Sequence, residues 1–421
     1  MNRILQIIES KKVLFKNFTS LSLLQIANYI FPLITLPYLV RVLGPEKYGL
    51  VNFASAFVAY FAILTDYGFN LSATQDVSVN IKDWKKVSTI FSSVLLIKLF
   101  FFLVSSVLFT AVILIFPQFK DETLLYIISF IGILGSTIFP IWFYQGIEKM
   151  YYILIINIFT RTSLTVLIFV LINSEKDFLL FAILSSISNL IVGVLGFSLA
   201  LIQLKIKFIL PKLDVMKQQI TNGWNLFLST LWINLYTTSN VFILGLFAPA
   251  NVVGYFAAAD KVRMAFQGIL TPITQSVFPY VNKLLSESYD KFISFNRKLL
   301  KIGFLLGLLI SLFLFIFAAP ISNLILGNDY RQSILVLKII SWLPLIIILS
   351  NVLGIQTMIP LNKHKEFSLI LFLAAMMNII ISFIIVPKYF EIGTSISVLI
   401  TEIFVTSSFY IFIKKEKINL I

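Results

Sequence analysis

The chain has 421 residues, of which 59% are hydrophobic and only 12% are charged, and its formal net charge is +14. A soluble domain cannot bury so much apolar surface, so the composition predicts an all-α polytopic membrane protein. The sequence has no cysteine, which excludes disulfides and thiolate ligands, and its one histidine, His364, stands between two lysines. We therefore expect no metal site, no cofactor and no histidine-based catalytic centre.

The chain opens on two apolar runs that are separated by a short turn. The runs cover 17–41 and 49–78, and the turn between them contains Gly44-Pro45. Each run exceeds roughly 20 residues, the length that a helix needs to cross about 30 Å of hydrocarbon. We therefore expect a hairpin of two transmembrane helices.

Polar side chains recur on one face of each of these two helices. Gln25 and Asn28 are three residues apart on the first helix, and Asp66 lies well inside the second. Residues three or four apart are neighbours on a helix surface, and hydrocarbon cannot satisfy amide or carboxylate groups. The hairpin is therefore predicted to form the wall of a polar interior, with Asp66 as a candidate ion-coupling residue.

Ten further apolar runs follow, which brings the predicted number of transmembrane helices to twelve. The twelve runs are 17–41, 49–78, 87–117, 123–145, 151–173, 178–203, 220–248, 252–282, 295–319, 331–359, 366–387 and 391–413. The polar stretch 204–219 reads as a cytoplasmic linker between an N-terminal lobe, 1–203, and a C-terminal lobe, 220–421. Each lobe is predicted to hold six helices.

Prolines within or near the ends of these runs mark places where helices are expected to bend. They are Pro32, Pro37, Pro140, Pro272, Pro279, Pro344 and Pro360. Each proline removes a backbone hydrogen-bond donor and clashes with the preceding turn of a helix. Together they suit a protein whose helices flex between two states.

The two predicted lobes share a short internal echo. The segment from Gly44-Pro45 to Tyr48-Gly49 resembles the segment from Ala248-Pro249 to Val253-Gly254. Each copy lies between the first and second helix of its lobe. Repeats in the same orientation predict two halves related by an axis along the membrane normal, which is a common plan among transporters.

Lysine and arginine are distributed unequally between the two predicted sides of the membrane. Connections on the side of the N-terminus carry 22 of these residues, and connections on the other side carry six. Cytoplasmic loops are enriched in positive charge, and an even number of helices returns both termini to one side. Both termini are therefore predicted to be cytoplasmic, with the basic surface facing anionic lipid head groups rather than nucleic acid.

The strongest candidate site residues lie in the run 252–282. Asp260, Lys261 and Arg263 fall about a third of the way into this run, and Gln267 continues the face of Asp260 and Arg263. Three ionisable groups at such depth must face one another or an aqueous cavity, and Asp260 is also a candidate ion-coupling residue. An internal ion pair between Asp260 and one cation would leave the other cation uncompensated. A cation in a cavity is what an anionic phosphate requires.

Four further polar residues inside apolar runs are weaker candidates. Arg161 lies mid-span, where it either faces the cavity or links two helices, and Asn225 belongs to a polar face that mirrors the one on the first helix. Glu402 is a further candidate ion-coupling acid. Lys98 is flanked by leucines and phenylalanines, so it either extends along its own stem toward the membrane surface or belongs to the site.

Motifs for catalysis are missing from the sequence. No GxxxxGK[ST] phosphate loop occurs, so the chain has no ATPase of its own. The predicted outward connections are too short for a catalytic domain, and acid–base chemistry at neutral pH would need paired carboxylates or a histidine near a pocket. We therefore expect a protein that is not an enzyme and has no catalytic residues.

Two segments carry a resemblance to a known family. The first is ANYIFPLITLPYLVRVLGPEKYGLVNFASAFVAYFAILTDYGFNLSAT, and the second is AAADKVRMAFQGILTPITQSVFPYV. Both resemble segments of the O-antigen and capsular polysaccharide flippases, which belong to the multidrug/oligosaccharidyl-lipid/polysaccharide exporter superfamily. The resemblance covers the whole chain, and Asp66, Lys261 and Arg263 occupy matching positions. Asp260 departs from the glutamate that the family would place before the lysine.

The resemblance implies a fold, a substrate and a location. The fold is two six-helix lobes around a central, cation-lined cavity in the bacterial cytoplasmic (inner) membrane. The substrate is an undecaprenyl-diphosphate-linked oligosaccharide repeat unit, which moves from the cytoplasmic to the outer leaflet by alternating access. Polysaccharide polymerase, chain-length machinery and membrane lipids are the expected partners. The candidate substrate-binding residues are Lys261, Arg263, Asn28, Gln25, Arg161, Gln267 and Asn225.

Rival functions stay open at this point. A drug or metabolite exporter of the same superfamily would have an acidic cavity, whereas the predicted cavity is biased toward cations. A membrane glycosyltransferase, polymerase or ligase would need a sizeable extracytoplasmic loop or an acidic metal site, and neither is visible in the sequence. A flippase for lipid-linked peptidoglycan precursors would be expected to have two further helices.

Overall fold

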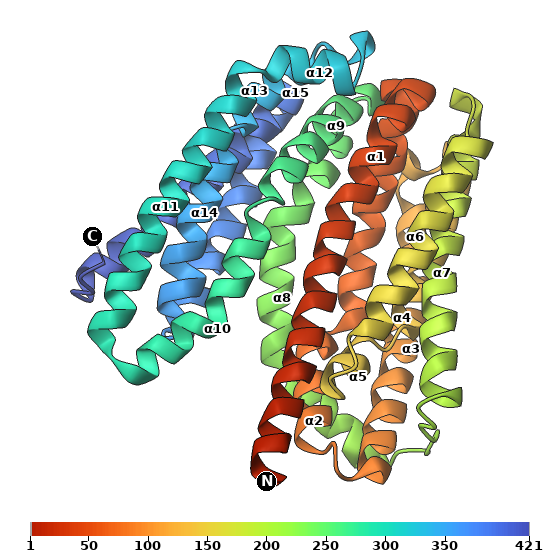
Figure 1. Cartoon of the computed structure of the whole chain (residues 1–421). Helices are drawn as coiled ribbons and strands as arrows, with labels where there is room; N and C mark the ends of the chain where they lie inside the picture. Colours follow the sequence, from red (N-terminus) through yellow and green to blue (C-terminus); the bar gives the residue numbers. More distant parts are fainter. Residues whose placement is uncertain (1, 421) are drawn as a thin grey trace. The chain divides into compact units, whose positions relative to one another are not determined.

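The computed structural model describes the backbone of residues 2–420, which forms helices joined by short connections (Figure 1). Side chains are described for Asn17 and for 19–420, apart from 225, 229, 272, 273, 275 and 276. This described part contains no strand, which confirms the predicted all-α class. The α-helices are α1 (Asn2–Asp66), α2 (Phe69–Val79), α3 (Trp84–Ile115), α4 (Thr123–Ile138), α5 (Ile141–Gly146), α6 (Tyr151–Leu171), α7 (Phe178–Ile202), α8 (Leu213–Phe247), α9 (Ala250–Gln267), α10 (Thr271–Glu287), α11 (Tyr289–Ile316), α12 (Ala318–Ile325), α13 (Ser333–Ile340), α14 (Leu343–Leu353) and α15 (His364–Lys415).

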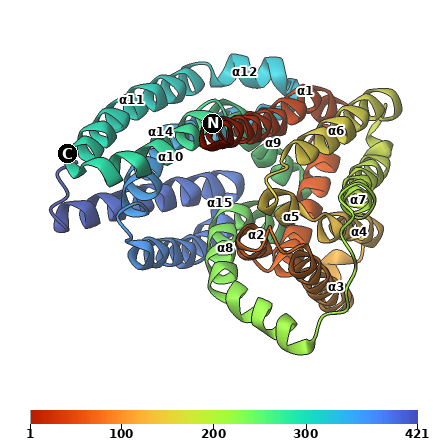
Figure 2. The same ribbon diagram turned by 60° about the horizontal axis from the view of Figure 1, so that its bottom comes forward.

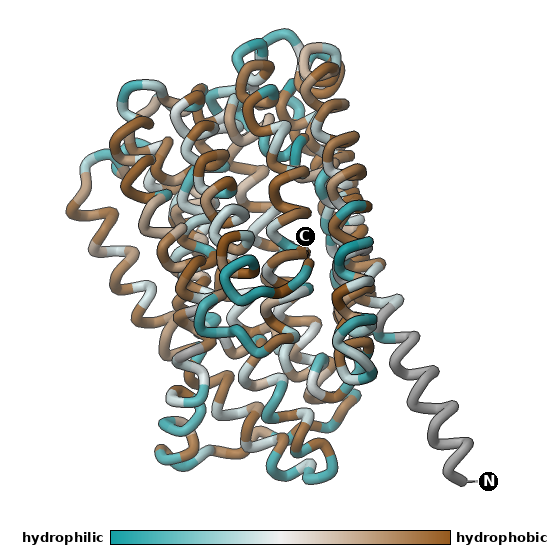
Figure 3. Tube along the Cα trace, turned by 90° about the vertical axis from the view of Figure 1, so that its left-hand side faces the viewer, coloured by the Kyte–Doolittle hydropathy of each residue, from teal (hydrophilic) through white to brown (hydrophobic). Residues whose placement is uncertain are grey.

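Eight helical stretches among the described residues are long and apolar enough to cross a membrane. They are Thr19–Val79, Trp84–Ile115, Thr123–Gly146, Tyr151–Leu171, Glu175–Ile202, Tyr289–Ile316, Ser333–Met358 and His364–Lys415. The first and the last span 61 and 52 residues, more than twice the length that one crossing needs, and each contains a break in the helix. Hydrophobic residues extend along the helices, and hydrophilic residues gather at many of the connections (Figure 3). The protein is therefore a multi-pass membrane protein, and the number of twelve crossings stays a prediction.

Two breaks near the start of the chain differ in their cause. Gly44 leaves the helical conformation within α1, with φ 66° and ψ 171°, and Pro45 follows it. This backbone region is essentially restricted to glycine, so the predicted turn is reduced to a break at one residue. Tyr67 and Gly68 then adopt left-handed φ values of 47° and 72° and end α1 at Asp66. The predicted second helix is thus divided in two.

Prolines mark three other interruptions. Pro140 lies between α4 and α5, and Pro272 and Pro344 lie in the first turns of α10 and α14. Proline is tolerated in the first turn because the amide that it lacks would have no partner within the helix. Pro32 and Pro37, by contrast, lie inside α1 without interrupting it.

The chain forms two compact units. The first unit comprises Met1–Phe31 and Ala54–Leu231, and its core contains buried aromatic side chains such as Trp142 of α5 and Phe91 of α3. Within it, α4 and α7 pack side by side (Figures 1 and 2). A Cβ added at Gly135 would lie 2.1 Å from a backbone oxygen of α7, so the two helices approach as closely as glycine allows.

The second unit comprises Pro32–Phe53 and Trp232–Ile421. Within it, α11 packs against α14, and α14 packs against α15 (Figure 1).

The two copies of the internal echo also meet in this unit. A Cβ added at Gly49 would lie 1.7 Å from the carbonyl oxygen of Ala250, and one added at Gly254 would lie 2.0 Å from that of Pro45. Each copy thus presses its glycine against the backbone of the other.

Candidate functional site

The main cluster of charged side chains in the second unit lies on α9. Nε of Arg263 donates to Oδ1 of Asp260 at 2.7 Å, as expected for residues three apart on one helix face. A second guanidinium nitrogen of Arg263 donates to the side-chain oxygen of Gln267, one turn further along. Arg263 is only 7% exposed, whereas the Asp260 side chain is 26% exposed. The guanidinium is therefore held between an acid and an amide of its own helix.

Lys261 lies on another face of α9. Its side chain is exposed, and no hydrogen bond or ion pair with another described residue involves it. Of the two cations on α9, Arg263 therefore forms the internal ion pair with Asp260, and Lys261 is the one without an acidic partner among the described side chains. An exposed ammonium without an acidic partner remains able to receive an anion.

A second acid faces Arg263 from α15. Glu402 is 7% exposed and lies close enough to Arg263 for their charges to interact. It accepts no hydrogen bond from any side chain in the part of the chain that the structure describes. Asp260 and Glu402 therefore compete with any bound anion for the guanidinium, which makes the affinity for an anion depend on the charge of these two carboxyl groups.

A pocket of about 390 Å³, lined by both polar and apolar side chains, continues from Gln267. Asn351 and Gln356 also line it, together with threonines and aliphatic side chains. Gln356 is 1% exposed and donates to the backbone oxygen of Thr274 at 2.8 Å, while its own side-chain oxygen has no partner among the described atoms. A buried amide oxygen left without a donor is uncommon and suits a ligand that carries hydroxyl groups. Sequence reasoning named Gln267 as a binding candidate but missed Asn351 and Gln356.

The first unit contains a separate buried ion pair. Nζ of Lys98 on α3 lies 3.3 Å from Oδ1 of Asp66 and 3.1 Å from the backbone oxygen of Ser136 on α4. Asn70 donates to the other oxygen of Asp66 at 2.9 Å. The Lys98 side chain is 3% exposed, so the expectation that it extends toward the membrane surface is wrong. Its charge is satisfied inside the protein, because a carboxylate and a carbonyl lie within its reach.

The remaining candidates of the first unit do not form a cluster with this pair. Gln25, Asn28 and Arg161 are half-buried, and no described hydrogen bond joins any of them to Asp66 or to one another. The side-chain oxygen of Asn28 is buried without a described partner. Asn225 lies in α8, but its side chain is outside the described residues. Their role in binding stays a prediction.

Known proteins resemble this chain in sequence and in fold. A family model described as "Polysaccharide biosynthesis protein" matches residues 14–285. The protein named "Putative O-antigen transporter" of Escherichia coli (strain K12) is 34% identical over 410 residues, which is 97% of this chain and 99% of that one.

Two solved structures share the fold at low sequence identity. The inward-facing conformation of a multidrug resistance MATE family transporter of the MOP superfamily has a TM-score of 0.70 at 15% identity, over 95% of this chain and 99% of that one. The lipid II flippase MurJ in an inward closed conformation has a TM-score of 0.68 at 14% identity, over 92% and 87%. The chain therefore has the fold of these transporters.

Proposed function

This chain belongs to the family of polysaccharide biosynthesis proteins, and from that premise we propose that it is a flippase for lipid-linked oligosaccharides. It is a membrane transporter and not an enzyme, in agreement with the prediction from its missing catalytic motifs. Its proposed substrate is an undecaprenyl-diphosphate-linked repeat unit of O-antigen or capsule. This lipid-linked repeat moves from the cytoplasmic to the periplasmic leaflet of the bacterial inner membrane.

The observation that carries this proposal is the pair of cations on α9. A diphosphate cannot enter hydrocarbon without compensation of its charge, whereas a polyprenyl tail is soluble there. Lys261 has no acidic partner among the described residues, and Arg263 is oriented by Asp260 and Gln267. These two side chains, on different faces of α9, bind the anionic groups of the substrate, which are the diphosphate or acidic sugars. The amides of the adjoining pocket accept and donate hydrogen bonds to sugar hydroxyls.

The transport path follows from the sequence pattern. Twelve helices in two six-helix lobes surround a central cavity, and both termini lie in the cytoplasm on the side with most lysine and arginine. The other candidate binding residues line this cavity. They are Gln25, Asn28 and Arg161 of the N-terminal lobe and Asn225 of the C-terminal lobe. The lobes rock to open the cavity to one leaflet and then to the other, while the tail stays in lipid.

Acidic residues provide the coupling to an ion gradient. Glu402 and Asp260 both act on Arg263, so a coupling cation, a proton or a sodium ion, that binds either carboxylate weakens its hold on the guanidinium and favours the anionic substrate. Asp66 is a third candidate, although Lys98 and Asn70 already satisfy its carboxylate. Polysaccharide polymerase and chain-length machinery receive the transported oligosaccharide on the outer side of the membrane.

Substitution of the two cations tests the function. In a deletion strain, Lys261→Ala and Arg263→Ala are expected to reduce surface polysaccharide by about tenfold or more, since a hydrogen bond to a charged group contributes roughly 1.5–3 kcal/mol. Lipid-linked repeat units should accumulate on the cytoplasmic leaflet, as measured by their accessibility in spheroplasts. Lys261→Arg and the exposed control Lys283→Ala should retain function. Normal surface polymer from both alanine variants at normal membrane levels would refute the assignment.

A drug exporter is the second candidate, because the solved multidrug transporter has the same fold. Such a protein would lower the accumulation of small organic cations in cells and would leave surface polysaccharide unchanged when deleted. Lys261 disfavours it, since its ammonium has no acidic partner among the described side chains and repels cationic compounds. Dye efflux measured beside surface polysaccharide in the deletion strain separates the two functions.

A further inference from the structure

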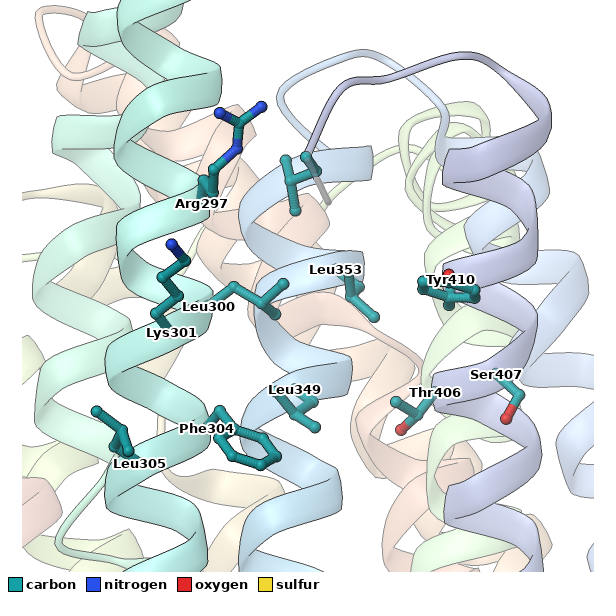
Figure 4. A pocket seen from close by; sticks show the side chains of 11 residues that line it. Arg297, Leu300, Lys301, Phe304, Leu305, Leu349, Leu353, Thr406, Ser407 and Tyr410 are labelled. Atoms are coloured by element: carbon teal, nitrogen blue, oxygen red, sulfur yellow. The ribbon is translucent and has the colours of Figure 1, made fainter.

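A groove of about 1090 Å³ lies in the second unit, away from the charges of α9. It runs between α11 and α15, with Leu349 and Leu353 of α14 between them (Figure 4). Most of its lining is apolar, but Arg297 and Lys301 of α11 stand near one end, as Figure 4 shows. None of the described side chains of α9 or α10 lines it. The groove is therefore a separate feature from the candidate transport site.

The two cations at the end of the groove lack an acidic partner among the described residues. They are four residues apart on α11 and so share one face, where like charges repel. Arg297 donates one hydrogen bond, of 2.5 Å, to the backbone oxygen of Asn419, and a guanidinium has five N–H donors in all. Both side chains are exposed. An anion bound between them would remove the repulsion.

The C-terminal segment closes the cationic end of the groove. Asn419 contacts Arg297, and the adjacent Leu420 is fully buried and lines the groove. The start of the segment is linked to the residue before α15, because Nζ of Lys363 donates to Glu416 at 2.6 Å. A long ligand therefore places its polar end at Arg297 and extends away from the C-terminal segment.

Apolar side chains continue from the cations toward the middle of α11. Phe304 and Leu305 are 44% and 58% exposed, as expected for side chains that contact hydrocarbon. From Arg297 to Leu305 the helix rises about 12 Å, which is long enough to seat a large part of an acyl chain. The groove therefore offers cations for a lipid phosphate at one end and apolar side chains for an acyl chain along the rest of its length.

We propose that this groove binds an anionic glycerophospholipid of the cytoplasmic leaflet. Its phosphate lies between Arg297 and Lys301, and one acyl chain lies along Leu300, Leu349 and Phe304. A free phosphate would leave the apolar lining unused. The predicted orientation places residues 283–301 on the cytoplasmic side, where anionic lipids attract basic residues. The inference does not depend on what the protein transports.

Lipid retention by the purified full-length protein tests the proposal. Protein in mild detergent is incubated with phosphatidylglycerol, phosphatidylethanolamine, undecaprenyl phosphate or inorganic phosphate, and bound molecules are counted by native mass spectrometry. Phosphatidylglycerol should be retained most strongly. Arg297→Gln with Lys301→Gln should weaken its retention by about 30-fold, the loss expected for two cations near a membrane surface. Lys298→Gln, on the same helix but outside the groove, is the matched single-charge control and should retain the lipid.

A second variant removes the apolar part of the site without changing charge. Leu349→Trp fills the groove and should also lower retention of phosphatidylglycerol, with thermal unfolding used to check that each variant is folded. Equal retention by the wild type and both groove variants would overturn the proposal. So would retention of phosphatidylethanolamine as strong as that of phosphatidylglycerol, or a preference for undecaprenyl phosphate, which would make the substrate tail the occupant.

Discussion

Each unit of the protein contains an acid–base pair whose cation is buried, and the two pairs are built differently. In the first unit, Lys98 of α3 reaches Asp66 at the end of α1 and a carbonyl of α4. In the second unit, Arg263 and Asp260 belong to one helix. The first pair ties three helices together, whereas the second can open without separating any. We infer that the first pair stabilises its unit and that the second is available for binding.

The position of Asp66 explains why its pair is needed. A carboxylate at the C-terminal end of a helix faces the negative end of the helix dipole, which is unfavourable. Asp66 is the last residue of α1, because Tyr67 and Gly68 leave the helical conformation. Lys98 offsets this repulsion, so the lysine and the helix end depend on each other. Asp260, in the middle of α9, has no such requirement.

The largest expected effect is on the first pair. Asp66→Ala leaves the ammonium of Lys98 buried without a carboxylate, which should lower the free energy of unfolding by about 3–5 kcal/mol. Thermal unfolding of the purified protein in detergent measures the loss. The double variant Asp66→Asn with Lys98→Met has no buried charge and should recover most of the stability. If Asp66→Ala were as stable as the wild type, the pair would not stabilise the packing of the three helices.

A smaller effect on stability is expected for the second pair. Asp260→Asn keeps an oxygen that accepts from Arg263, and the pair is partly exposed, so the loss should be about 1–2 kcal/mol. Surface polysaccharide should nevertheless fall more than the loss of folded protein explains. Surface polysaccharide and the amount of folded protein are measured on the same cells, and their ratio is compared with that of the wild type. A variant that loses stability but transports normally per folded molecule would reverse the assignment of roles.

The smallest effect is expected for a pair on the surface of the second unit. The hydrogen bond from Lys363 to Glu416 raises the pKa of Lys363 above its ordinary value. A raised pKa contributes stability that is fully present below the unfolded value, about 10.4, and is lost as the pH rises through the folded value. Glu416→Gln should therefore lower the unfolding temperature slightly at pH 8, and the difference should vanish in strongly alkaline buffer. A difference that persists there would indicate a cause other than the charge of Lys363.

Sequence reasoning found the pair on α9 but missed the pair between Asp66 and Lys98. The separation of the two partners along the chain explains both results. Asp260 and Arg263 are three residues apart, so helix geometry alone brings them together. Asp66 and Lys98 are 32 residues apart, and only the packing of α1 against α3 and α4 makes them neighbours. Two opposite charges inside neighbouring apolar runs are a signal that could have suggested the pair.

The helices themselves were predictable to the extent that local chemistry sets their ends. Gly44-Pro45 predicted a break because few other residue pairs accept that backbone. The break at Tyr67 was not predicted, since tyrosine rarely adopts a positive φ and its surroundings impose it. Asn351 and Gln356 in the pocket beside Gln267, and the groove between α11 and α15, were not predicted, because each site is formed by helices that are distant in sequence.

Gly49 and Gly254 cannot drift independently over evolutionary time. Backbone oxygens occupy the space where either Cβ would lie, so trimming a neighbouring side chain would not make room for alanine. The backbone of each copy of the internal echo therefore requires a glycine in the other copy. Sequences that diverge freely elsewhere should therefore keep both glycines or lose both at once.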